Sequence, residues 1–207
     1  MQFGTKLALG LLALFVLVAG TAYAGIDSDK KVKLGEPAVD FTLNDSEGKQ
    51  HSLSDFKGKT VVLVWTNPDC PYVVPHCQSR TLDAIDAKFD DEKVAILQID
   101  STDTGSVERT KKTAQKYELE VMTLHDFDGK VGRTYGAKTT PHCFVIDAEG
   151  KLVYEGALDN APRGQIRGDD TKKVNYVEAA LNDVMAGRAP AIQSTTPYGC
   201  GVKYAKK

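Results

Sequence analysis

The 207-residue chain lacks a strong excess of charge of either sign, and it has neither an internal repeat nor a low-complexity segment. Its 26 lysine and arginine residues nearly balance its 28 aspartate and glutamate residues, so the formal net charge is −2. A chain without a basic patch is not expected to bind nucleic acid or anionic lipid electrostatically. Charge therefore argues against these two classes of partner.

Cysteine is also scarce, with four residues in the chain: Cys70, Cys77, Cys143 and Cys200. Four cysteines are too few for a disulfide scaffold in a chain of this length. In an exported protein, part of such an even-numbered set is expected to be oxidised. Four cysteines allow three complete pairings, so their number leaves the connectivity open. The role of each cysteine must therefore be inferred from its own position in the chain.

Only one long apolar run is present, the segment LALGLLALFVLVAG that follows Lys6. Together with the small residues of Ala22-Tyr23-Ala24, it is typical of a secretory signal peptide that is cleaved after Ala24. A membrane anchor is the alternative, but the run is shorter than the ~20 apolar residues that a spanning helix needs. We expect a periplasmic or secreted protein with no stable membrane association after cleavage.

The remaining chain predicts an α/β protein with a mixed central sheet. Alternating residues around Gly48 predict an N-terminal β-hairpin, and the β-branched run TVVLVW predicts a strand buried on both faces. Further strands are expected over residues 94–100, 121–126, 139–147 and 151–158, and helices over 71–89, 106–119, 130–137 and 172–187.

The last of these helices carries an apolar stripe of Val174, Val177, Ala180, Leu181 and Val184. Parallel β-α-β units followed by an antiparallel pair place helices on both faces of the sheet. We divide the chain into a signal peptide over 1–24, one domain over 25–188, and a tail over 189–207 that carries Cys200.

Cys70 stands between the predicted strand 60–65 and Pro71, which suits the first position of a helix. The N–H groups and dipole at that position favour a thiolate over a thiol, and His76 is a candidate for additional positive charge. A static cysteine is the alternative. We favour a reactive one, because loops at the carboxyl ends of strands commonly carry function.

Cys77 lies seven residues after Cys70, which in a continuous helix separates them by ~10 Å along the axis. That distance is too long for a disulfide, unless Pro75 distorts the start of the helix.

The Thr140-Pro141 pair precedes a strand at the same end of the predicted sheet, and it is a candidate for a cis peptide bond. Cys143 follows on this strand and is expected to be a buried core thiol.

Several motifs together resemble those of the thioredoxin-like, peroxiredoxin-related redoxins of the AhpC/TSA type. They are TNPDCPYV, YGAKTTPHCFVIDAEGKLVYEGALD, NYVEAALNDVMAG with the later TTPYGCGVKY, and the N-terminal AVDFTLND with GKQHSLSDFKGKTVVLVW. This resemblance covers nearly all of the chain after the signal peptide. It implies a thioredoxin fold with an N-terminal hairpin, Cys70 in the redox loop, and Thr140-Pro141 as the cis-proline pair that faces it.

The chain departs from both standard patterns of these families. The first cysteine of a C-x-x-C motif would fall on Asn67. In the peroxiredoxin pattern P-x-x-x-T/S-x-x-C, Asn67 replaces the hydroxyl residue and Leu63 replaces the proline. The arginine that peroxiredoxins place before the later strand is replaced by Thr140-Pro141.

The resemblance also assigns the tail cysteine to the family pattern, and it implies Cys200 as the resolving partner of Cys70. The glycines on both sides of Cys200 would let it reach back over the end of the sheet. The resulting disulfide is either redox-active or a static clip. The expected catalytic set is Cys70, Cys200, Thr140 and Pro141, with Cys77, His76, Asn67 and Trp65 as candidate accessory residues.

We expect an exported thiol-disulfide oxidoreductase or a peroxiredoxin-like antioxidant enzyme that needs no cofactor. Its substrate would be a protein disulfide or a small peroxide, and a separate thiol reductant would regenerate it. One alternative is a Sco-like copper module using Cys70, Cys77 and a histidine, chiefly His125, with His76 and His142 also open. Another is a thioredoxin-fold binding protein without catalysis.

Overall fold

The computed structural model describes residues 31–166 and 172–206, so the expected signal peptide lies outside the described residues. The strands are β1 (Thr42–Asn44), β2 (Gln50–Ser52), β3 (Thr60–Thr66), β4 (Val94–Asp100), β5 (Thr123–His125), β6 (Thr139–Thr140), β7 (His142–Ile146), β8 (Leu152–Gly156) and β9 (Cys200–Gly201). The helices are α1 (Val74–Gln78), α2 (Thr81–Asp86), α3 (Val107–Tyr117), α4 (Lys130–Tyr135) and α5 (Tyr176–Met185), with 3-10 turns η1 (Leu53–Phe56) and η2 (Pro162–Gly164). Within these residues, no helix is long and apolar enough to cross a membrane.

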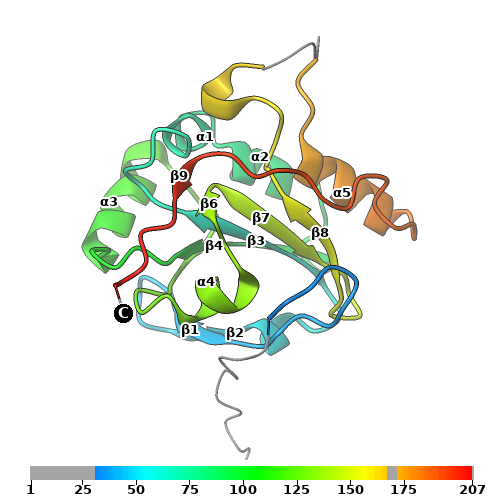
Figure 1. Cartoon of the computed structure of the whole chain (residues 1–207), viewed down its shortest axis with the longest axis horizontal. Coiled ribbons are helices and arrows are strands. Elements are labelled where there is room, and N and C mark those ends of the chain that lie inside the picture. The colour runs from blue at the N-terminus through cyan, green and yellow to red at the C-terminus, as the bar shows by residue number, and fades with distance from the viewer. Residues whose placement is uncertain (1–30, 167–171, 207) are drawn as a thin grey trace, which may run out of the picture.

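A seven-stranded mixed sheet in the order β2-β1-β5-β4-β3-β7-β8 forms the centre of the molecule (Figure 1). Strand β3 pairs in parallel with β4 and antiparallel with β7, and all seven of its residues are buried, as its β-branched run predicts. The predicted N-terminal hairpin is the antiparallel pair β1 and β2. The predicted α/β class and mixed sheet are confirmed.

Two apolar clusters cover the two faces of the sheet. Tyr135 and Val131 of α4 pack with Trp65 and Phe144 in one cluster. The other cluster contains Ile85 of α2 together with Val177 and Leu181 of α5. The helices therefore lie on both faces, as the strand-helix alternation predicts.

The prediction of one helix over residues 71–89 is wrong in its extent, because the chain forms the two short helices α1 and α2 in this region. Arg80 has a left-handed backbone conformation (φ 47°) between α1 and α2. The hydroxyl of Ser79 donates to the carbonyl of Pro75 at 2.8 Å, a local bond of the kind that competes with helix continuation. Pro75 falls in the first turn of α1, where its missing N–H costs no helical hydrogen bond.

The strand expected over 139–147 also divides. The Thr140–Pro141 peptide bond is cis, as predicted, and it separates β7 in the main sheet from β6. In addition, α5 begins only at Tyr176, capped by the side chain of Asn175, so Val174 is exposed and does not belong to the apolar stripe. The buried stripe is formed by Val177, Ala180 and Leu181.

The C-terminal tail packs across the sheet and does not extend away from it. Ser194 forms a parallel bridge with Glu155 of β8, and β9 then pairs antiparallel with β6. Farther on, Lys203 accepts a backbone hydrogen bond from Asp103, and Ala205 accepts one from the Arg133 guanidinium. Figure 1 shows this segment in red, running over the end of the sheet past β6.

Candidate redox-active site

Cys70 lies in the loop between β3 and α1, where it is 2% exposed. Its backbone N–H donates to Asn67, and its carbonyl accepts from the N–H groups of Val73 and Val74. Cys70 thus opens the first helical turn but precedes α1 by four residues, so it does not lie directly at the start of the helix as the position of Pro71 predicts. A five-residue helix supplies only a weak dipole, and the stabilisation of a thiolate must come from nearer groups.

Those nearer groups belong to the cis-proline loop and the tail. In the neutral state the Cys70 thiol donates to the carbonyl oxygen of Thr140 at 3.1 Å, a bond that is lost on ionisation. Burial raises the pKa of Cys70, but hydrogen bonds from Thr140 and from the backbone of Cys200 and Tyr72 outweigh it, so the pKa lies below the ordinary value. The Thr140 hydroxyl is buried and makes no hydrogen bond to any described residue, so its proton is free to be donated to Cys70 once the thiol ionises.

Cys200 lies directly opposite Thr140, because β9 pairs with β6 in the register Thr140↔Cys200 and Thr139↔Gly201. It also packs against the cluster formed by Cys70, Val73 and Cys77. Partial burial and the neighbouring Cys70 thiol raise the pKa of Cys200. Both cysteines are free thiols in this structure, and they are close enough to affect each other's ionisation.

A glycine is required beside Cys200 for this pairing. Gly199 has φ +126°, and a Cβ atom at this position would collide with the carbonyl oxygen of Thr140. Gly201, on the other side of Cys200, has no such constraint, because a Cβ there would approach no closer than 3.9 Å to the Lys138 carbonyl. The close approach of the two backbones thus depends on Gly199.

Asn67 and Trp65 have structural positions around the loop. The Asn67 side chain accepts from the N–H of Asp69 at 2.9 Å, so the residue at the missing C-x-x-C position stabilises a turn. Trp65 is fully buried in the opposite cluster, and its indole N–H donates to Ser101 at 3.0 Å. Trp65 thus packs in a different cluster from the one that contains Cys70.

Cys77 and Cys143 are buried thiols that are held in the protonated form. Burial, with a contribution from Asp83, raises the pKa of Cys77 to about 11. Cys143 is fully buried, which raises its pKa further and agrees with the predicted core thiol. Burial lowers the pKa of His76, which argues against this histidine as a source of positive charge near Cys70.

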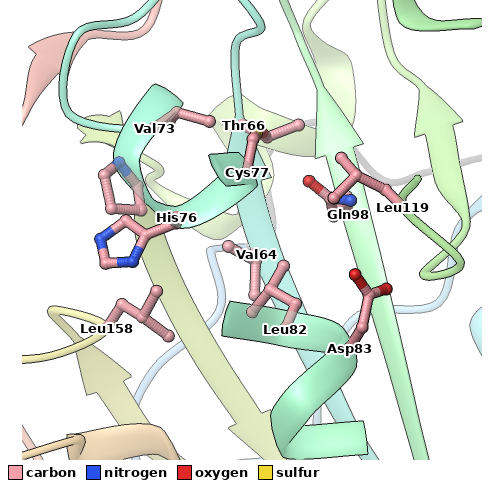
Figure 2. Close-up of a pocket in the computed structure, with 11 residues that line it drawn as sticks. Val64, Thr66, Val73, His76, Cys77, Leu82, Asp83, Gln98, Leu119 and Leu158 are labelled. Carbon is pink, nitrogen blue, oxygen red and sulfur yellow. The ribbon is translucent and has the colours of Figure 1, made fainter. Parts of the chain in front are cut away.

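A small cavity lies between α1, α2 and the sheet, and Figure 2 shows His76 and Cys77 of α1 beside it. Its volume of about 20 Å³ accommodates roughly one water molecule, so a substrate does not fit inside. Its remaining lining residues are Val64, Thr66, Val73, Leu82, Asp83, Gln98, Leu119, Pro141 and Leu158.

The histidine and cysteines of the copper alternative are not brought together. His125, at the end of β5, contacts the hydroxyl of Ser46 and the ring of Phe127. Among the residues that the structure describes, no three His, Cys, Asp or Glu side chains are arranged to hold a metal ion. The geometry thus gives the copper reading no support.

Sequence reasoning missed Tyr198, Asp159 and Lys173. The Tyr198 hydroxyl donates to Asp159 at 2.6 Å, and it lies 3.0 Å from Nε2 of His76. Lys173 forms an ion pair with the same carboxylate at 3.1 Å. The available signal was the position of a tyrosine two residues before the tail cysteine in PYGCGVKY, but no pattern in the sequence links that tyrosine to Asp159.

A buried thiol with a lowered pKa, placed beside a cis-proline at the end of a central strand of this sheet, defines a thioredoxin-fold thiol oxidoreductase. The sequence matches the model of the AhpC/TSA family over residues 34–155. The chain therefore belongs to the AhpC/TSA family.

Curated relatives support the same class of enzyme. The chain is 31% identical over 168 residues to a thiol-disulfide oxidoreductase ResA from Bacillus cereus, covering 79% of this chain and 87% of the relative. It is 32% identical over 163 residues to the protein of the same name from Bacillus anthracis, covering 76% and 89%. The chain thus belongs with the thiol-disulfide oxidoreductases of this family.

Solved structures confirm the fold. A hypothetical protein from Sinorhizobium meliloti aligns with a TM-score of 0.73 and 27% identity, covering 86% of this chain and 98% of that one. The thioredoxin domain of a thiol-disulfide oxidoreductase from Bacteroides vulgatus aligns with a TM-score of 0.53 and 26% identity, covering 67% and 92%. The thioredoxin fold that the motifs imply is confirmed.

Proposed function

We propose that this chain is an exported thiol-disulfide oxidoreductase in which Cys70 is the attacking thiolate and Cys200 is the resolving cysteine. The observation that carries the proposal is the pairing of β9 with β6, which places Cys200 opposite Thr140 and against Cys70. The signal-peptide pattern over residues 1–24 supports export. An exported enzyme would have to be regenerated by a thiol reductant outside the cytoplasm.

The reaction needs only the two sulfur atoms of the chain and a substrate disulfide. The Cys70 thiolate attacks one sulfur of the substrate, which forms a mixed disulfide and releases the other sulfur as a thiolate. Cys200 then attacks Sγ of Cys70, which releases the second substrate thiol and leaves a Cys70–Cys200 disulfide. Two electrons have passed to the substrate, and an external dithiol supplies two more when it reduces the internal disulfide and is itself oxidised to a disulfide.

The opposite pKa shifts support this order of events. Thr140 and the backbone groups favour the thiolate at Cys70, whereas the negative charge at Cys70 disfavours a second thiolate at Cys200. When Cys70 enters a mixed disulfide its charge is lost, and this cause of the raised pKa of Cys200 disappears. Cys200 thus becomes a better nucleophile at the step that requires it.

A small peroxide is a poorer fit to the loop than a disulfide. Asn67 occupies the position of the peroxiredoxin hydroxyl residue, and its side chain accepts a bond from the backbone of Asp69. Arg109 is paired with Asp69 and Asp100 at 3.0 and 3.3 Å, so its guanidinium is already engaged by two carboxylates. We therefore place disulfide exchange first.

Reduction of insulin disulfides by single-cysteine variants tests this proposal. Cys70→Ser should abolish turnover, whereas Cys200→Ser should accumulate a mixed disulfide between Cys70 and the substrate. Cys77→Ala is the matched control, and it should retain activity within about threefold, because a buried thiol with a raised pKa supplies little thiolate. Activity that survives in Cys70→Ser would contradict the role of Cys70. A wild-type protein that is inactive toward disulfides would contradict the proposal and favour the binding-protein alternative.

A further inference from the structure

The tail segment 193–205, here called the strap, covers the redox loop by means of several separate contacts. Its first part pairs with Glu155 of β8, its middle part is β9 on β6, and Tyr204 near its end donates to the carbonyl of Ala137 at 2.9 Å. Cys70 is only 2% exposed beneath it. Cys200 of the strap packs against the cluster that contains Cys70, so movement of the strap would uncover part of this cluster.

Tyr198 is the strap residue that enters a buried charged network. Its hydroxyl donates to Oδ1 of Asp159 at 2.6 Å, so the 3.0 Å contact with His76 is supplied by the Nε2–H of the histidine. In this tautomer the other ring nitrogen, Nδ1, carries no proton, and it can accept a hydrogen bond from the hydroxyl of Thr81 at 3.2 Å. The ring of Tyr198 also packs against that of Tyr72, with centroids 6.1 Å apart.

Asp159 makes this anchor strong, because its carboxylate is fully buried. It accepts from the Tyr198 hydroxyl and from the N–H of Ala161 at 2.9 Å, and it pairs with Lys173. A buried carboxylate that loses a donor is poorly solvated, so a hydrogen bond of this kind changes an equilibrium constant by roughly one to two powers of ten.

We propose that Tyr198 is a positioning residue for the redox reaction: its bond to Asp159 holds Cys200 against Cys70 and keeps the strap closed over the site. The anchor and the cysteine are separated only by Gly199, so loss of the anchor releases β9 directly. The chain thus raises the effective concentration of its own resolving thiol and limits the access of substrate by the same contact. This inference rests on the proposed function.

The test is the rate at which iodoacetamide modifies Cys70 in the reduced, full-length protein, with each cysteine followed by peptide mass mapping. Tyr198→Phe removes only the hydroxyl and should accelerate modification of Cys70 by about tenfold or more, because the strap opens more often. Tyr204→Phe is the matched control, since it removes a hydroxyl from the same strap without touching Asp159, and it should change the rate by less than about threefold.

Positioning of Cys200 has its own readout, which is the equilibrium of the Cys70–Cys200 disulfide with glutathione. Tyr198→Phe should lower the equilibrium constant for forming this disulfide by about tenfold, which corresponds to about 30 mV for a two-electron couple. Asp159→Asn keeps an acceptor for Tyr198 but removes the charge, so it should fall between wild type and Tyr198→Phe.

Three results would overturn the inference: an unchanged modification rate of Cys70 in Tyr198→Phe, an equal acceleration at Cys77, or an equal effect of Tyr204→Phe. An unchanged equilibrium with glutathione would overturn the positioning of Cys200. A wild-type protein that forms no Cys70–Cys200 disulfide would instead defeat the proposed function, and the modification experiment would still decide the role of Tyr198.

Discussion

The reactivity of Cys70 depends on a few neighbouring groups more than on the helix that follows it. The sequence predicts a thiolate stabilised by a helix N-terminus and by a protonated His76. In the structure, α1 has five residues and begins at Val74, and burial lowers the pKa of His76. Thr140 and the backbone of Cys200 and Tyr72 provide the stabilisation instead. Thr140 and Cys200 lie far from Cys70 in the sequence, so the spacing of residues does not predict their contact with Cys70. Only Tyr72 is close to it in the sequence.

Replacing Thr140 tests this account at the scale of one residue. Thr140→Val keeps the β-branched shape and removes the hydroxyl, so the pKa of Cys70 should rise and less thiolate should be present at pH 7. The dependence of the iodoacetamide rate on pH should shift to higher pH, with a several-fold slower reaction at neutral pH. Thr139→Val is the control, because the Thr139 hydroxyl donates to the carbonyl of Pro141 and not to Cys70. Equal midpoints in both variants would rule out Thr140 as a source of thiolate stabilisation.

At the scale of elements, the long buried strands were predictable and the elements around the site were not. The β-branched runs of β3 and β4 specify buried strands by composition alone. The two-residue strands β6 and β9 have no such pattern, since each forms only because the other is present. The break between α1 and α2 likewise depends on the local conformation of Arg80, which a periodic apolar pattern does not indicate.

Gly199 provides a test of the β6–β9 pair. Gly199→Ala forces a Cβ atom against the Thr140 carbonyl at a left-handed φ, so β9 should lose its register and the free energy of unfolding should fall by about 1–3 kcal/mol. Gly201→Ala is a matched control with ordinary contacts, and we expect a change within about 0.5 kcal/mol. Urea unfolding of the reduced proteins measures both values. Similar stabilities of the two variants would show that the close approach at Gly199 is not required.

At the scale of the whole molecule, the fold joins segments that are distant in the sequence into one site. The redox loop follows β3, the cis-proline follows β6, and Cys200 comes from a tail that crosses the sheet after α5. Family motifs predicted the thioredoxin fold, the cis-proline and the pairing of Cys70 with Cys200 as a hypothesis. The strap's anchor on Asp159 was not predictable, because a buried carboxylate has no sequence signature of its own.

The central claim is that Cys70 and Cys200 form a reversible redox pair, and disulfide mapping across a series of glutathione ratios tests it most directly. Peptides of the native protein, digested without reductant, should show Cys70 linked to Cys200, with Cys77 and Cys143 reduced. The bond should open at a potential above about −300 mV, the value below which structural disulfides typically lie. A link from Cys70 to Cys77, an unlinked Cys200, or a bond that resists reduction at such potentials would contradict the account.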